Sequence, residues 1–403
     1  MANRYEQVLR DEWDKFKNGK ELLPNILLLG ATGCGKSSLV NTIFHRQLAP
    51  VNDVARGTDD FKTYWGKDYD IGVNLIDSRG YELEDGKGES YETYIAAINN
   101  LIENNRKKKP LEQIHIVWFC ISILGSVQEY DLQVMKKLLQ EPALRGRVGV
   151  VLTKCDEDDK EGSEAKVFKT ILADHFGVTL PVFEVSTDLS LDLEMEDLID
   201  WSASQLTDID LQQAFIASQM ISLKQKREMS AKRIAIFCSA AAAIGATPIP
   251  LSDAALLTPL QLSMATMIIH IYGIDDLATI SKSVVGDFII ANLGKSIAGG
   301  LLKLFPGIGS FLGGMINGGV AAFITAALGF AISEICYETC KKIANGQQVD
   351  FSSLFDKASI QELAKQFMKT HKPSDIVLHL SQKDQEKAKE YASEYQGKYG
   401  NKL

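Results

Sequence analysis

The stretch NILLLGATGCGKSS, residues 25–38, decides the fold of this chain. Its first half is a short apolar run after Pro24, and it predicts a buried strand that ends at Gly30. Its second half matches the pattern G-x-x-x-x-G-K-[ST], whose glycines let backbone N–H groups turn inward around phosphates where a helix begins. At average composition, a match to the four fixed positions arises by chance in roughly one chain in a hundred of this length. The stretch therefore predicts a phosphate-binding loop.

Two side chains of this loop carry most of the expected chemistry. Lys36 supplies a positive charge to the β- and γ-phosphates, and the Ser37 hydroxyl is suited to bind Mg²⁺. The residues expected to bind the nucleotide here are Gly30, Thr32, Gly33, Cys34, Gly35, Lys36, Ser37 and Ser38.

A second motif, D-x-x-G, follows an apolar run at residues 75–80. Asp77 stands at the expected end of a strand, where a carboxylate orients a magnesium ion. The backbone N–H of Gly80 is expected to approach the γ-phosphate, since glycine has no Cβ to prevent it.

A switch threonine that contacts the γ-phosphate and Mg²⁺ is expected between these two motifs. The candidates are Thr58 and Thr63. Thr58 is favoured because it precedes the predicted strand 61–65, whereas Thr63 lies inside it. Lys36, Thr58 and Gly80 form the expected catalytic set, and Ser37, Thr58 and Asp77 the expected metal set.

The third motif is TKCD, residues 153–156, which ends another apolar run and matches [NT]-K-x-D. The Asp156 carboxylate can accept two hydrogen bonds from guanine, from N1–H and from the 2-amino group. Adenine offers no such pair, so the carboxylate would lose its partners at a cost of about 1–3 kcal/mol. The Lys154 stem is suited to pack along the base, and Ser186 stands where a backbone N–H contacts the guanine O6. Thr153, Lys154, Asp156 and Ser186 therefore complete the expected nucleotide site.

Apolar runs alternate with helical periodicity through most of the first half of the chain. This alternation predicts a mostly parallel sheet with helices on both faces. The expected strands are 25–29, 61–65, 71–76, 114–122, 148–152 and 182–185. The expected helices are 37–45, 91–103, 130–139, 164–175 and 194–205.

The pattern changes after Asp208, where strand-like alternation stops. One long helix is expected over 210–243, carrying a basic cluster, and it is followed by weakly charged stretches at 234–252, 254–274 and 304–333. The expected organisation is an N-terminal amphipathic helix (1–22), an α/β domain (23–206), an all-α hydrophobic domain (207–345) and a polar helical tail (346–403).

Charge and cysteine content exclude some classes of protein. The chain has 403 residues, with 52 acidic against 43 basic residues and a net charge of −9. This balance argues against DNA as a partner, because non-specific nucleic-acid binding needs a basic footprint. Six cysteines without paired spacing make no disulfide framework, and residues 1–20 lack the apolar core of a secretory signal. A reducing, cytoplasmic location is expected.

In this order and spacing, the three motifs resemble those of a translation-factor-class GTPase close to the Era/TrmE-like bacterial group. The segment 114–121, followed by 148–156, is similar to a subgroup that often carries a hydrophobic, helical C-terminal domain of unknown function. The stretch from TPIPL (247–251) to Tyr272-Gly273 resembles that domain. The resemblance implies a P-loop GTPase fold, GTP and GDP as ligands, Mg²⁺ as cofactor and hydrolysis of GTP.

Two departures from the family pattern bear on turnover. Tyr81 follows Gly80 where many GTPases place a water-orienting glutamine, so slow basal hydrolysis is expected. Gly33 stands where potassium-activated relatives carry asparagine, so potassium stimulation is not expected. A partner protein or a second G domain, as in a homodimer, is then needed to complete the site.

Three functions stay open at this stage. The first is a GTP-hydrolysing switch that controls a helical, membrane-directed domain; the others are a ribosome- or RNA-associated GTPase and a nucleotide-dependent scaffold with little hydrolysis. Residues 304–333 carry no formal charge and are long enough to span a bilayer, but Gly318-Gly319 divides them. Both a membrane association, with lipid or a membrane protein as partner, and a compact soluble bundle fit this stretch.

Overall fold

The computed structural model describes residues 10–11, 22–45, 61–69, 71–78, 91–177, 179–246, 254–274, 318–350, 353–372 and 380–399. The chain divides into two compact units, Glu21–Ser222 and Leu223–Leu403 together with Met1–Lys20.

The first unit is built on a six-stranded sheet with the strand order β2-β3-β1-β4-β5-β6. Neighbouring strands are parallel except β2, which pairs with β3 in the antiparallel sense. The strands are β1 Asn25–Leu29, β2 Phe61–Tyr64, β3 Asn74–Ser78, β4 Ile114–Ser122, β5 Val148–Thr153 and β6 Val182–Glu184. The expected α/β fold of a P-loop GTPase is confirmed.

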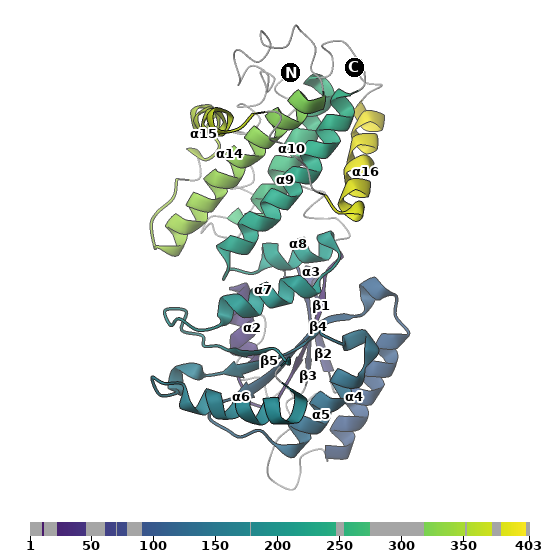
Figure 1. Ribbon diagram of the computed structural model, residues 1–403, viewed down its shortest axis with the longest axis vertical. Coiled ribbons are helices and arrows are strands. Elements are labelled where there is room, and N and C mark those ends of the chain that lie inside the picture. Colours follow the sequence, from purple (N-terminus) through teal and green to yellow (C-terminus); the bar gives the residue numbers. More distant parts are fainter. Residues whose placement is uncertain are drawn as a thin grey trace. The chain divides into compact units, whose positions relative to one another are not determined.

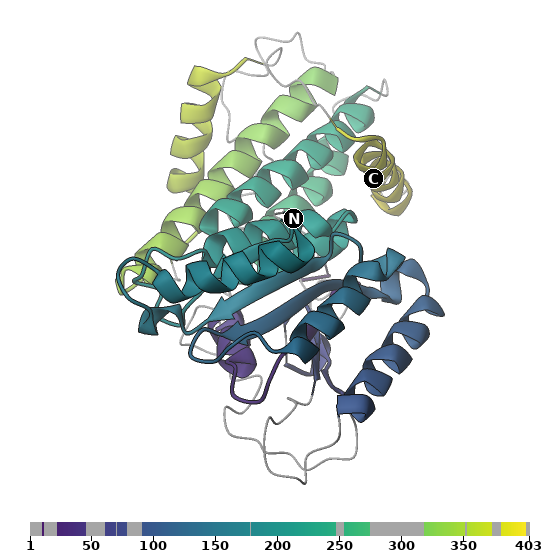
Figure 2. The same ribbon diagram turned by 60° about the horizontal axis from the view of Figure 1, so that its bottom comes forward.

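Helices cover both faces of this sheet (Figure 1, Figure 2). They are α2 Lys36–Phe44, α3 Gly66–Tyr69, α4 Tyr91–Arg106, α5 Glu129–Gln140, α6 Ser163–Phe176, α7 Met195–Gln205 and α8 Ile209–Ser218, with three short 3₁₀ turns at Pro110–Glu112, Pro142–Leu144 and Cys155–Glu157.

The two faces have separate apolar cores because successive strand residues point to opposite sides. On one face Val117, Phe119 and Ile121 of β4 pack with buried residues of α4, α5 and α6. On the other face the Trp118 ring stacks on Phe44 of α2, and its Nε1–H donates to Ser202 Oγ of α7 at 3.0 Å. Consecutive residues of β4 thus pack against the helices on both faces of the sheet.

The expected single helix over 210–243 is wrong, because the chain turns between α8 and α9 Leu223–Gly245. Gln219, which is fully buried, makes the turn: its side chain accepts from the N–H groups of Ile221 and Ser222 at 2.7 and 2.8 Å and donates to the Ser222 carbonyl at 2.9 Å. One side-chain amide thus replaces the hydrogen bonds that a continuing helix would make.

Residues 207–222 belong to the first unit, beyond the expected border at 206. The Met220 N–H donates to the Ile43 carbonyl at 2.9 Å, and a Cβ added at Gly72 would lie 2.2 Å from the Ala214 carbonyl oxygen. Such close backbone contacts attach α8 to the sheet unit.

The described part of the second unit is helical. Its helices are α9, α10 Ala254–Tyr272, α14 Gly318–Ala344, α15 Lys357–Thr370 and α16 Gln382–Tyr399. Helices α9 and α14 run antiparallel, since Ala242 lies at Gly318, Ile234 lies at Gly329 and Arg227 pairs with Glu334. Phe367 of α15 packs on Phe323 and Phe330 of α14, whereas Tyr391 of α16 stacks on Phe237 of α9.

Helix α14 is the one described helix that is long and apolar enough to cross a membrane, and 78% of its most apolar window is buried in the structure. It contains residues 318–333 of the uncharged stretch; residues 304–317 lie outside the described residues, as does TPIPL at 247–251. Of the expected N-terminal helix, the structure describes residues 10 and 11, which are helical, and Leu22.

Candidate nucleotide-binding site

The loop between β1 and α2 has the backbone that its sequence predicts. Gly30, Gly33 and Gly35 have φ values of 136°, 74° and 97°, a region that L side chains rarely adopt. A Cβ added at Gly30 would also lie 2.2 Å from the Cys120 carbonyl oxygen of β4. Glycine is therefore required at Gly30 both by its φ and by the neighbouring strand.

Lys36 points its charge into this loop. The side chain is 7% exposed, and its Nζ donates to the carbonyl oxygens of Gly30 at 2.8 Å and Ala31 at 3.1 Å. Helix α2 begins directly at Lys36, and its N-cap Gly35 offers no side chain to the first-turn N–H groups. A buried ammonium and a helix N-terminus thus meet where an anion would be stabilised. Thr32 and Gly33 are exposed at the loop tip, and Ser37 and Ser38 are half-buried.

Asp77 lies near the end of β3, between β1 and β2. Its register partners are Leu28 and Lys62. Its Oδ1 is buried and, among the described residues, has no hydrogen-bond partner. Burial raises the pKa of Asp77, and the charges of Lys36 and Lys62 oppose that rise. A buried carboxylate oxygen of this kind fits a divalent cation, because Mg²⁺ prefers oxygen ligands.

The TKCD segment and Ser186 come together after β5 and β6. The Cys155 N–H donates to the Val185 carbonyl at 3.2 Å, which holds the two strand ends together. The Ser186 hydroxyl donates to Asp156 Oδ1 at 2.7 Å, and Ser186 Oγ accepts from the Asp188 N–H at 3.0 Å. Asp156 is exposed, and Lys154 has a left-handed backbone with φ 60°. The carboxylate is therefore oriented while it remains open to a ligand.

One hydroxyl joins the two halves of the site. Thr153 Oγ1 lies within hydrogen-bond distance of the Cys34 carbonyl in the phosphate loop and 3.4 Å from the Ile121 carbonyl. A Cβ at Gly35 would lie 3.3 Å from the same hydroxyl. The three sequence motifs predict neither this contact nor the hydrogen bond from the Asp188 N–H to Ser186 Oγ. Both become visible only when the strands are placed side by side.

The structure brings together most of the expected residues at the carboxyl edge of the sheet. These are Gly30, Thr32, Gly33, Cys34, Gly35, Lys36, Ser37, Ser38, Asp77, Thr153, Lys154, Asp156 and Ser186. Thr58, Gly80 and Tyr81 lie outside the described residues.

Three cysteines surround the site, and burial raises the pKa of each thiol. The pKa of Cys34 is raised, that of Cys120 well above its ordinary value and that of Cys155 to about 12. Since the thiolate is the reactive form, these side chains act as small apolar groups in the packing.

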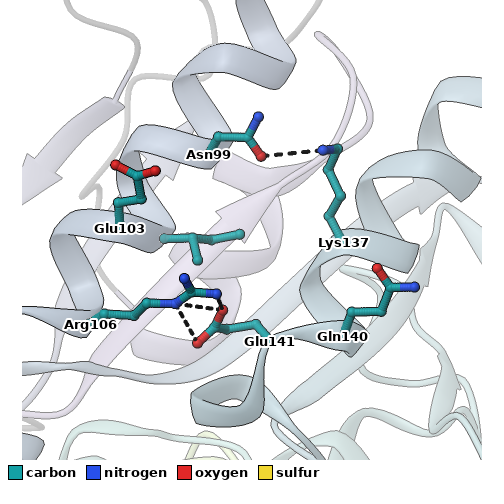
Figure 3. A pocket seen from close by; sticks show the side chains of 7 residues that line it. Asn99, Glu103, Arg106, Lys137, Gln140 and Glu141 are labelled. Atoms are coloured by element: carbon teal, nitrogen blue, oxygen red, sulfur yellow. Dashed lines mark hydrogen bonds and ion pairs between the residues drawn. The ribbon is translucent and has the colours of Figure 1, made fainter.

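A groove of about 300 Å³ lies between α4 and α5 and contains none of the expected nucleotide residues (Figure 3). Its walls are Asn99, Ile102, Glu103, Arg106, Lys137, Gln140 and Glu141. Arg106 Nε donates to both Glu141 carboxylate oxygens, at 3.1 and 3.0 Å, and Lys137 Nζ donates to Asn99 Oδ1 at 3.3 Å. The Arg106 hydrogen bonds hold the pKa of Glu141 below its ordinary value. One ion pair, Arg106–Glu141, thus crosses this groove.

The geometry and a family match together identify a P-loop GTPase domain in this chain. Residues 25–154 match the family model described as 50S ribosome-binding GTPase. That range runs from the first residue of β1 into the TKCD motif, so it contains the phosphate loop and Asp77. The chain therefore has a GTP-binding GTPase domain.

Two curated proteins are similar to part of this chain. Septin-8-A of Danio rerio is 27% identical over an alignment of 183 residues that covers 41% of this chain and 42% of that protein. GTPase Der of Chloroherpeton thalassium is 26% identical over an alignment of 171 residues that covers 41% of this chain and 34% of that protein. The chain thus matches less than half the length of either relative.

Among solved structures, Toc33 from Arabidopsis thaliana in complex with Mg²⁺ and GMPPNP is 18% identical with a TM-score of 0.30, covering 47% of this chain and 80% of that one. The G domain of the T. maritima FeoB iron transporter is 20% identical with a TM-score of 0.28, covering 45% of this chain and 98% of that one.

Proposed function

We propose that this protein is a GTP-hydrolysing switch whose nucleotide state controls its helical unit. The observation that carries the proposal is the Thr153 hydroxyl, which connects the phosphate loop at Cys34 to the segment that presents Asp156. A site with this link reads the base and holds the phosphates as one rigid piece. Discrimination of guanine is then coupled to the geometry at Lys36.

The phosphate side of the proposed mechanism depends on positioning and charge. Lys36 leaves the loop carbonyls to bind the β- and γ-phosphates, while the N–H groups from Gly33 to Ser38 surround them. Ser37 and Asp77 would hold Mg²⁺, which neutralises charge on the phosphate oxygens when it is bound. Thr58 and Gly80 are proposed to contact the γ-phosphate. Because Tyr81 cannot orient water as glutamine does, unassisted turnover is slow.

A second copy of the G domain is the proposed source of the missing group. Large apolar side chains stand exposed in the loops after β4 and β6: Leu124 at 61%, Leu189 at 53% and Leu191 at 42%. These loops leave the same carboxyl edge as the nucleotide site, and exposed apolar groups at one edge suit a protein contact. Turnover that increases with the square of protein concentration would support the pairing, whereas a rate per molecule that is constant on dilution would refute it.

For the helical unit we propose a membrane association that depends on the nucleotide. Helix α14 supports it by length and hydropathy, although most of its apolar window is buried in the present packing. Flotation with liposomes in the presence of GDP or a non-hydrolysable GTP analogue tests the proposal. Recovery with lipid in one nucleotide state is expected, and no recovery in either state would contradict it.

Guanine recognition is tested by Asp156→Asn. An asparagine amide offers a donor to the 2-oxo group of xanthine, so the variant should lose GTP affinity and gain XTP affinity, each by at least about tenfold. Glu157→Gln is the matched control, since Glu157 is the exposed neighbouring acid. Binding constants for GTP, XTP and ATP decide the matter. Equal affinity of the wild type for ATP and GTP would refute guanine specificity.

The family description favours a second candidate, a ribosome-associated GTPase. The acidic balance of the chain gives no support to broad RNA binding. Fractionation of the native protein among ribosome, membrane and soluble pools, with GDP or the GTP analogue, separates the two candidates. Nucleotide-dependent recovery with ribosomes and not with lipid would favour the second.

A further inference from the structure

We infer that Lys62 is a tethered counter-ion of Asp77 that reduces the dependence of nucleotide binding on Mg²⁺. The inference rests on the proposed function, because it concerns the same phosphate site. It assigns a role to a strand residue that lies in none of the three motifs.

The sheet register places Lys62 next to Asp77. The two residues are direct partners of the antiparallel β2–β3 pair, so their side chains leave the same face with Cβ atoms about 5 Å apart. Tyr64 is on the same face of β2, two residues further on. Its ring centroid is 4.8 Å from Lys62 Nζ, and the Tyr69 ring packs against it at 5.8 Å. Lys62 is exposed, and its contact with the Tyr64 ring holds the ammonium over the face of the sheet from which the Asp77 side chain also leaves.

Asp77 therefore has a cation on each side. Strand β3 lies between β1, which leads into the loop of Lys36, and the edge strand β2, which carries Lys62, so a lysine comes from each side of the strand that holds Asp77. In the present structure Lys36 donates to the loop carbonyls. Once Lys36 turns to the phosphates of a bound nucleotide, Lys62 is the lysine that still neutralises Asp77.

Two opposite effects on the ligands follow from this charge. Without Mg²⁺, the Lys62 ammonium reduces the repulsion between the Asp77 carboxylate and the phosphates, so GDP binds more tightly than it otherwise would. With Mg²⁺, the ammonium repels the metal and shares its carboxylate, so Mg²⁺ binds more weakly. Both effects make the affinities with and without the metal more alike.

The test compares the dissociation constants of GDP in Mg²⁺ and in EDTA, measured by calorimetry on the full chain. For Lys62→Met, the ratio of the EDTA value to the Mg²⁺ value should rise by roughly 3- to 10-fold over the wild type. This range corresponds to a unit charge at about 6 Å with an effective dielectric constant of about 80 to 40. The concentration of Mg²⁺ that gives half-maximal GDP affinity should fall in the same variant.

Three further variants make the result specific. Lys62→Arg keeps the charge and should retain the wild-type ratio. Lys67→Met removes an exposed lysine of α3, only five positions further along the chain, and should also leave the ratio unchanged. Lys62→Gln is a second neutral variant, so a folding defect in Lys62→Met alone does not decide the outcome.

The outcomes distinguish this inference from the proposed function. An unchanged ratio in both neutral variants would overturn the role of Lys62 while leaving guanine-nucleotide binding intact. An equal rise in Lys67→Met would also overturn it, because the effect would then belong to the overall charge of the domain. A wild type that binds neither GDP nor GTP would instead refute the proposed function.

Discussion

Each of the two compact units buries a lysine almost completely, and the two lysines have different surroundings. Lys36 in the sheet unit is 7% exposed and donates to two carbonyls of a loop that begins a helix. Lys226 in the helical unit is 1% exposed, and its Nζ donates to the Ile271 carbonyl at 2.9 Å, one residue before α10 ends. Both charges have partners, as buried charges must. The elements around them decide whether the partner is exchangeable.

The acceptor of Lys226, the Ile271 carbonyl, belongs to a helix end that is packed in the interior. A cation is favourable at the C-terminus of a helix, where carbonyl groups lack intrahelical donors. The neighbouring Tyr272 carbonyl accepts from Cys340 Sγ at 3.6 Å, and the Tyr272 hydroxyl lies 3.0 Å from Ser333 Oγ. Side chains from α9 and α14 thus satisfy the end of α10 permanently. Lys36, in contrast, bonds to loop carbonyls that it can leave for a phosphate.

The largest effect expected from this comparison is that of Lys36→Ala. Loss of the ammonium should weaken GTP and GDP binding by roughly 30- to 1000-fold or more, because truncating one partner of a buried charge pair costs about 2–5 kcal/mol of binding free energy. The Tm should change little, because among the described residues the Lys36 ammonium donates to two carbonyls of its own loop, Gly30 and Ala31. Calorimetric titration and thermal unfolding measure the two quantities. A Tm that falls together with affinity would make Lys36 a structural lysine like Lys226.

His115 is another buried titratable group of the sheet unit, and it lies at the amino end of β4. Its Nδ1 accepts the Asn25 N–H at 3.0 Å, which requires the neutral ring. Burial, with a smaller contribution from Arg147 and against the effect of Asp208, lowers the pKa of His115 to about 4. His115 thus lies at the amino end of its strand, whereas the nucleotide site lies at the carboxyl edge of the sheet.

The pH dependence follows from that pKa. The unfolded chain binds a proton at His115 near pH 6.5, and the folded chain does so only near pH 4. The stabilisation is therefore fully present above about pH 6.5 and is lost as the pH falls toward 4, up to about 3 kcal/mol. His115→Gln keeps an acceptor for Asn25 and cannot titrate, so its stability should vary less over this window. Urea unfolding at several pH values checks this, and equal slopes for both proteins would contradict it.

The sheet unit was largely predictable because its chemistry constrains local sequence. A phosphate loop needs glycines within six residues of a lysine, and the TKCD motif begins at the end of a strand, so spacing alone predicted where both segments lie. The alternation of apolar runs predicted the sheet. The missing information was tertiary: the Thr153–Cys34 link spans 119 positions, and the Lys62–Asp77 pairing depends on strand register.

The helical unit was less predictable, since nothing in its sequence separates a buried charge from a surface one. Lys226 belongs to a basic cluster typical of an exposed helix, and its partner Ile271 lies 45 positions away. The turn at Gln219 was missed for a related reason. A glutamine within a helical pattern predicts that the helix continues. The sequence does not reveal that this side chain is completely buried, where its amide bonds to the backbone of the turn.

Lys226→Met should lower the stability of the helical unit by about 1–3 kcal/mol, because the Ile271 carbonyl loses a donor in the interior. Methionine keeps most of the volume, so packing loss contributes little. Guanine-nucleotide affinity should stay at the wild-type value. Thermal unfolding by circular dichroism and a GDP titration measure the two. A variant with wild-type stability but altered nucleotide affinity would contradict the structural role of Lys226.

The smallest expected effect is that of Gly329→Ala in the helical unit, and Gly30 of the sheet unit provides the contrast. Gly30 is required by a fixed backbone atom of β4, whereas a Cβ at Gly329 would lie 2.7 Å from Cγ1 of a side chain, Ile234 of α9. Alanine gains about 1 kcal/mol of helix propensity at Gly329, and overpacking costs about 1–3 kcal/mol, so Gly329→Ala should lose roughly 1 kcal/mol.

The contact with Ile234 can be isolated by a double-mutant cycle. In an Ile234→Ala background the new methyl group at Gly329 finds space, so Gly329→Ala should become neutral or stabilising there. Unfolding free energies of the four proteins give the coupling between the two positions. If Gly329→Ala raises the Tm of the otherwise unchanged chain, α9 and α14 can move apart at no cost. Glycine at position 329 would then permit the close approach of these two helices without being necessary for the stability of the chain. At Gly30, in contrast, the backbone of β4 leaves no room for a side chain.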